Sequence, residues 1–162
     1  AIGYAGIRYI NKSGRNDIVT SKVIVDKKNI YFYAETAETL TPHTDDNWML
    51  LLIDADKNSD TGWYGYDFII NKNVKNDTQT SLMRYDEART DWIKVANVVF
   101  RYQGNKLMIS VPRKVLGLEG NSFAFDFKWS DNTADLNDPI SLCLNGDTAP
   151  NRRFNYRCIW NR

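Results

Sequence analysis

The sequence contains very few of the residues on which several common catalytic sites depend. Of its 162 residues, one is histidine and two are cysteine. Because His43 stands alone between a proline and a threonine, we do not expect a Cys–His catalytic pair. Cys143 and Cys158 flank a loop near the C-terminal end, and the spacing permits either a disulfide across a hairpin or two buried thiols.

Charge of one sign and long apolar runs are also lacking. The chain has 21 Lys and Arg against 20 Asp and Glu, which gives a net charge of +1. Since no basic stripe stands out, nucleic acid is not the expected partner. No apolar run approaches the ~20 residues that a membrane-spanning helix needs. Residues 1–10 do not form a signal peptide, which leaves the compartment open.

Aromatic residues and short alternating segments, in contrast, are plentiful. Aromatics make up 13% of the chain, and residues 30–38 alternate between apolar and polar positions as a half-buried strand does. About ten such segments with short turns predict an all-β sandwich or barrel of antiparallel strands, in one domain over residues 1–162. Residues 1–16 are expected to form a strap or edge strand, and residues 112–117 one helical turn, because Pro precedes it and Gly ends it. The predicted strands are residues 17–26, 30–38, 48–53, 65–72, 79–86, 92–102, 107–111, 123–129, 140–144 and 154–160.

A loop rich in oxygen-bearing side chains follows the most apolar of these segments, residues 48–53. Carboxylate or amide groups stand at every second position, and a further acid begins the next strand: Asp54, Asp56, Asn58, Asp60 and Asp67. Hard cations such as calcium take oxygen ligands, and alternate spacing turns several oxygens inward when the backbone curls. The loop is not an EF-hand, because its sixth and twelfth positions are Ser and Gly instead of Gly and Glu. We therefore predict a metal site, with calcium as first candidate and sodium or a solvated turn as alternatives.

Flat rings and planar polar side chains occur next to this loop and at one other strand end. A sugar presents an apolar C–H face to aromatic rings, and its hydroxyls bond to carboxylates, amides and guanidinium groups. These features predict a carbohydrate site, for which a sandwich core filled with large rings is the alternative explanation. The candidate sugar-binding residues are Trp63, Tyr64, Arg84, Asp126 and Trp129.

Three stretches carry a resemblance to a known family. Residues 48–56, 61–67 and 125–132 resemble the family 9 carbohydrate-binding modules, and residues 146–151 and 154–157 resemble C-terminal domains of secreted Bacteroides-type proteins associated with glycoside hydrolases. The resemblance covers roughly residue 17 onward. It implies a jelly-roll-like β-sandwich, bound calcium near Asp54, Asp56 and Asp67, and non-catalytic sugar binding between two tryptophans. It also implies a secreted, periplasmic or cell-surface location and a glycoside hydrolase domain as partner in the same chain.

Two other functions stay open at this point. The domain is a structural or protein-interaction module if its surface has no aromatic-lined groove. It is a small glycoside hydrolase if two carboxylates lie roughly 5–9.5 Å apart across a cleft, although no acid carries a motif for that role.

Overall fold

The computed structural model describes residues 15–144, 146–151 and 154–162. Ten strands lie in this part of the chain, joined by antiparallel pairing into one sheet with the order β1-β2-β7-β6-β5-β4-β3-β8-β10, and β9 pairs with β8. Two four-residue helical turns, α1 (Arg113–Leu116) and α2 (Ser141–Leu144), accompany the sheet. The strands are β1 (Ile18–Val25), β2 (Asn29–Thr36), β3 (Leu50–Asp54), β4 (Phe68–Val74), β5 (Gln79–Asp86), β6 (Asp91–Gln103), β7 (Lys106–Pro112), β8 (Ser122–Asp131), β9 (Asp147–Ala149) and β10 (Tyr156–Asn161).

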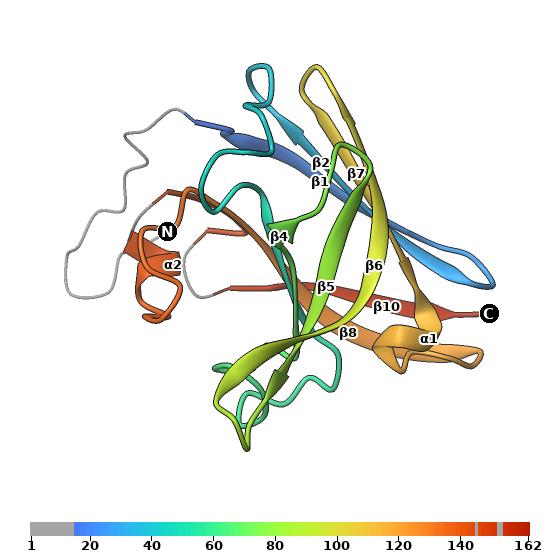
Figure 1. Cartoon of the computed structure of the whole chain (residues 1–162). Coiled ribbons are helices and arrows are strands. Elements are labelled where there is room, and N and C mark those ends of the chain that lie inside the picture. Colours follow the sequence, from blue (N-terminus) through green and yellow to red (C-terminus); the bar gives the residue numbers. More distant parts are fainter. Residues whose placement is uncertain (1–14, 145, 152–153) are drawn as a thin grey trace.

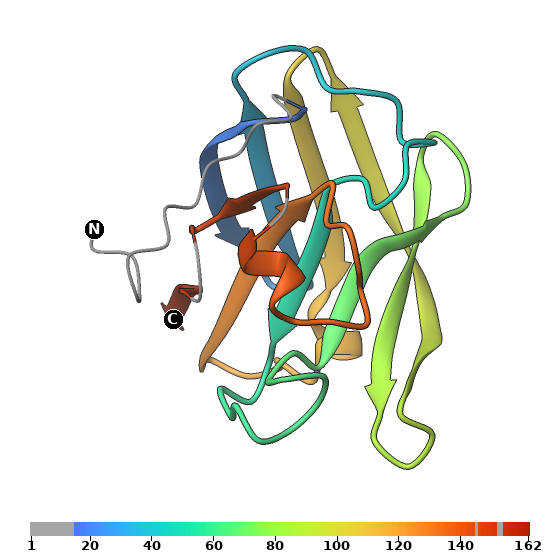
Figure 2. The same ribbon diagram turned by 90° about the vertical axis from the view of Figure 1, so that its left-hand side faces the viewer.

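The sheet curves so strongly that strands far apart in its order face each other, as Figures 1 and 2 show. Phe32 of β2 packs edge-on against Phe125 and Phe127 of β8, with ring centroids 5.8 and 5.4 Å apart. The backbone N–H of Ile18 at the start of β1 donates to Asp147 of β9 at 2.6 Å. The result is a nearly closed, barrel-like sheet. The predicted all-β antiparallel class is confirmed, but the division into two sheets of a sandwich is not.

Alternation along the strands places the main core inside this curve. In β2, Ile30, Phe32 and Ala34 are fully buried, and the residues between them are half exposed. Both faces of β3 are buried, because a second apolar cluster covers its outer side. That second cluster consists of Leu50, Leu52, Trp63, Tyr66, Ile69, Met83 and Leu142.

Most of the predicted strands are present, with ends shifted by a few residues. Residues 140–144 are an exception, because residues 141–144 form the helical turn α2 instead of the predicted strand. Leu142 of this turn belongs to the second cluster. The segment between the predicted strands 140–144 and 154–160, where no strand was expected, contributes β9, which pairs with the end of β8. The predicted N-terminal strap lies, up to residue 14, outside the described residues. No helix in the described ranges is long and apolar enough to cross a membrane.

Candidate functional site

The acidic loop closes the end of the β3–β4 hairpin, at the lower end of the sheet in Figure 1. The last paired residues of the two strands are Ile53 and Phe68. The N–H of Asp67 donates to the Ile53 carbonyl at 2.8 Å, which brings the residues flanking this pair, Asp54 and Asp67, to the mouth of the loop. Two strand ends thus hold two of the predicted metal ligands in place, independently of the loop between them.

Three carboxylates converge at this mouth. One oxygen from each of Asp54, Asp56 and Asp67 lies within 4.8 Å of the other two. Asp54 is 6% exposed, and its Oδ1 is buried without a hydrogen-bond partner among the described residues. A buried, unsatisfied carboxylate oxygen is costly in free energy, and a cation bound by the three acids would remove that cost.

The acids differ in the direction of their pKa shifts. Burial, followed by the neighbouring Asp56 carboxyl and the charge of Asp67, raises the pKa of Asp54 to about 7. Burial is also the main reason that the pKa of Asp67 is raised. Burial works to raise the pKa of Asp56 as well, but hydrogen bonds from Thr61 and the Asn58 N–H outweigh it and lower that pKa. In the absence of a cation, the group therefore resists carrying its full negative charge.

The loop itself is stiffened by short-range hydrogen bonds. The Thr61 hydroxyl donates to Asp56 Oδ2 at 2.7 Å, and the Ala55 N–H donates to Asp67 Oδ2 at 2.8 Å. Asn58 was predicted as a ligand, but its side-chain oxygen accepts from the Asp60 N–H at 3.0 Å. Asp60 is exposed and does not belong to the converging acids. These two residues shape the turn, as Asn and Asp commonly do.

An open cavity of about 360 Å³ lies beside the acids. Arg84 of β5, opposite Phe68 in the β4–β5 pairing, contributes an exposed guanidinium group to it. Tyr85 contributes a half-buried ring, and Glu87 accepts a hydrogen bond from the Gly62 N–H at 2.8 Å. The structure thus brings the predicted residue Arg84 next to the predicted metal ligands. No sequence pattern singled out Tyr85 or Glu87, because their positions depend on the β4–β5 register.

The two predicted tryptophan platforms are buried on opposite faces of the sheet. Trp129 of β8 is fully buried in the main core, beside Leu51 of β3. Trp63 is 7% exposed and packs in the second cluster, 6.1 Å from the ring centroid of Trp92. A sugar cannot lie between them, so the prediction of a Trp63–Trp129 pair is wrong. Their burial area stabilises the two clusters instead.

The remaining predicted sugar-binding residues lie near the acids but differ in availability. Tyr64 lies at the tip of a tight turn, which is closed by hydrogen bonds between the backbone N–H and carbonyl groups of Trp63 and Tyr66. Its side chain is 66% exposed. Asp126 pairs with Asp54 across the β3–β8 ladder. Its carboxylate accepts two hydrogen bonds from Arg157, at 2.7 and 3.0 Å, and is therefore already engaged.

The cysteine question is settled for one of the two residues. Cys158 on β10 is a free, partly buried thiol, and burial raises its pKa. A raised pKa reduces the thiolate fraction, which is the nucleophilic form. The side chain of Cys143 lies outside the described part of the chain.

A scan against protein-family models finds no match for this chain, and comparisons with curated proteins and with solved structures find none either.

Proposed function

We propose that this protein is a non-catalytic carbohydrate-binding domain in which a calcium ion bound by Asp54, Asp56 and Asp67 stabilises the edge of the sugar site. The observation that carries the proposal is the Asp54 side chain, which has one buried oxygen without a partner among the described residues and lies close to two further carboxylates. Calcium takes six to eight oxygen ligands at roughly 2.3–2.6 Å, so three carboxylates leave positions for water or a sugar hydroxyl.

The cavity next to the acids is the proposed sugar site. It combines the Arg84 guanidinium group, the Tyr85 ring and the Thr61 hydroxyl, which suit the hydroxyls and the C–H face of a hexose. The family resemblance supports the same function. The proposal also includes what that resemblance implies: a jelly-roll-like sandwich, a glycoside hydrolase partner, and a secreted or cell-surface location.

Titration calorimetry with neutral mono- and oligosaccharides, in calcium and in EDTA, tests the proposal. We expect calcium-dependent binding that Arg84→Ala weakens about tenfold or more, which corresponds to about 1.4 kcal/mol. Arg89→Ala is the matched control, because Arg89 is an exposed arginine on the adjacent turn that does not line the cavity. Absence of calcium binding, or equal losses in the two variants, would contradict the proposal.

The same carboxylates raise the question of a hydrolase, since one raised and one lowered pKa are typical of acid–base pairs. Against this, the Asp54 side chain is buried and does not line the cavity proposed for the sugar. We therefore expect no hydrolysis of aryl glycosides between pH 4 and 8. Hydrolysis that disappears in Asp67→Asn would favour the enzyme instead.

An interaction domain is the second candidate, and strand β10 favours it. This strand is the last in the order of the described sheet. It carries Ile159, which is 67% exposed, and follows Phe154, which is 68% exposed. An unpaired edge with exposed apolar side chains is a template for pairing with another chain. Sedimentation analysis of the wild type and of Ile159→Lys would test this. A wild-type protein that is dimeric and a variant that is monomeric would support the interaction domain.

A further inference from the structure

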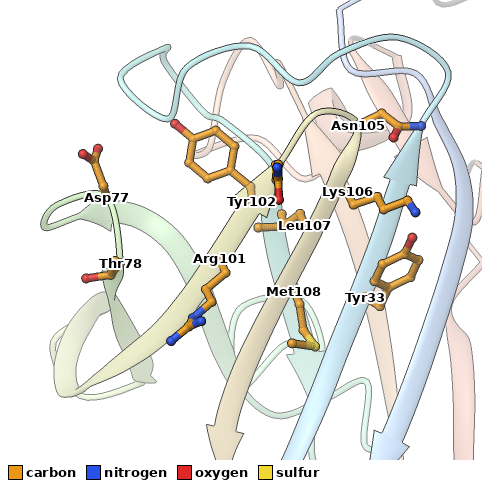
Figure 3. A pocket seen from close by; sticks show the side chains of 10 residues that line it. Tyr33, Asp77, Thr78, Arg101, Tyr102, Asn105, Lys106, Leu107 and Met108 are labelled. Atoms are coloured by element: carbon orange, nitrogen blue, oxygen red, sulfur yellow. The ribbon is translucent and has the colours of Figure 1, made fainter.

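A second cavity, larger than the one beside the acids, lies at the opposite end of β6 from them, on the outer face of the curved sheet. It is open, has a volume of about 740 Å³, and is lined by residues of β2, β6 and β7 and of the turn before β5. Figure 3 shows the labelled side chains around it, with Met108 between Arg101 on one side and Tyr33 on the other.

Strand register explains this arrangement. Tyr33 of β2 lies opposite Met108 of β7, and Met108 lies opposite Arg101 of β6, so the three side chains form one cross-strand row. The next row contains Lys106, which lies opposite both Glu35 and Gln103. Neighbouring positions in such rows are about 5 Å apart and diagonal ones about 7–8 Å, which places both cations within reach of one small ligand.

The floor of the cavity is apolar and held in place. Met108 is 40% exposed, although it lies in the middle of a strand pair. The Tyr33 hydroxyl donates to Glu35 Oε2 at 2.9 Å, and the Lys22 ammonium group lies 5.6 Å from the centre of the Tyr33 ring. These contacts fix the orientation of the ring. The floor can therefore receive a flat C–H face without reorganising.

The cations around the cavity outnumber the acids by one. Neither Arg101 nor Lys106 has an ion pair within the described ranges. The two nearby acids keep their charge, because Glu35 accepts hydrogen bonds from the neutral groups of Tyr33 and Asn105, and Asp77 contacts His43 at 2.7 Å. Three cations, Lys22, Arg101 and Lys106, lie around the cavity against these two acids. Two cations on either side of an apolar floor are complementary to a ligand with an apolar face and a negative group.

From this geometry we infer that the cavity binds an anionic sugar unit, that is, a hexose ring that carries a carboxylate or a sulfate group. The ring lies on Met108 and Tyr33, the anionic group pairs with Arg101 or Lys106, and the Gln103 and Asn105 amides bond to ring hydroxyls. Arg101 matches a carboxylate or sulfate with two parallel hydrogen bonds. The inference extends the proposed carbohydrate-binding function to a second, calcium-independent site.

The test uses titration calorimetry of the whole chain in EDTA, with oligogalacturonate, a sulfated disaccharide and neutral cello-oligosaccharide as separate probes. We expect binding of at least one anionic probe, and a tenfold or greater loss of it in Arg101→Gln/Lys106→Gln. The control is Lys72→Gln/Arg89→Gln, which removes the same net charge from exposed positions outside the cavity. The comparison of the first two probes identifies carboxylate or sulfate as the preferred anion.

Three outcomes would overturn the inference. One is no binding of either anionic probe, and the second is an equal loss in both double variants, which indicates attraction by net charge only. The third is anionic binding that Asp54→Asn abolishes, since that places the ligand at the acids. Failure of the proposed function is distinguishable, because it concerns calcium-dependent binding of neutral sugars and its loss in Arg84→Ala.

Discussion

Asp54 shows how strongly the chemistry of one residue depends on the structure around it. In the sequence it is one of several acids in a polar loop. In the structure it ends the buried strand β3, has a buried oxygen without a partner among the described residues, and faces two carboxylates. Its pKa of about 7 against an ordinary value of 3.8 means that ionised Asp54 destabilises the folded state when no cation is bound.

The pH dependence of stability follows from the sign of this shift. Because the folded state holds the Asp54 proton more tightly than the unfolded state, this group lowers stability as pH rises from about 4 to about 7. The raised pKa of Asp67 acts in the same direction. We expect the melting temperature in EDTA to fall by several degrees between pH 5 and 8, since 1 kcal/mol corresponds to roughly 2–4 °C at this size. Thermal denaturation followed by circular dichroism measures it.

Calcium and the substitution Asp54→Asn should both remove this pH effect. Calcium at pH 8 neutralises the carboxylates and restores the melting temperature of the wild type. Asp54→Asn cannot ionise, so we expect its melting temperature in EDTA to vary less with pH and to respond little to calcium. A wild-type melting temperature that rises from pH 5 to 8 in EDTA would contradict this account.

At the scale of elements, the loop between β3 and β4 depends on one glycine. Gly62 has a φ of +70°, and a Cβ built on it would lie 2.2 Å from the Tyr66 carbonyl oxygen and 3.0 Å from Asp67 Oδ1. The turn therefore brings its own backbone against Asp67, one of the proposed calcium ligands. Glycine is required there both for its backbone conformation and for the close approach.

We expect Gly62→Ala to destabilise the loop and to weaken calcium binding at least tenfold, because the new methyl group displaces Tyr66 or Asp67. Gly104→Ala is a matched control, since Gly104 also has a positive φ, +60°, but nothing lies within 4 Å of its added Cβ. Strain of the backbone alone costs about 1 kcal/mol and affects both variants. Calcium titration of both variants separates the two effects, and equal affinities would show that the close approach is unimportant.

At the scale of the whole molecule, Asp131 ties separate parts of the chain together. It is fully buried at the end of β8 and accepts hydrogen bonds from Arg15 at 2.9 Å, from Asn16 at 3.2 Å and from the Met49 N–H at 2.9 Å. These contacts join the segment before β1 to β3 and β8. The closure of the sheet thus depends on a buried charge as well as on the aromatic core.

Asp131→Ala should lower the free energy of unfolding by about 3–5 kcal/mol, because it removes one partner of a buried ion pair. Asp126→Ala on the same strand is the control. Its partner Arg157 has a side chain that is 57% exposed, and an exposed pair contributes about 1 kcal/mol or less. Urea denaturation gives both values. Similar losses in the two variants would show that burial of the pair does not matter.

The sequence by itself determined the all-β class, most strand positions and a loop of five candidate ligands, of which only the structure brings three acids together. The alternation of apolar and polar residues that marks a strand depends only on neighbours one and two positions apart. The three acids lie at one hairpin end, so their proximity also depends on residues that are close in the chain. Only the tertiary structure decided that Trp63 and Trp129 are buried, that residues 141–144 form a helical turn, and that Tyr33, Met108 and Arg101 share a row. Burial and register depend on which strands become neighbours and how the sheet curves, and these are properties of contacts between residues far apart in the chain.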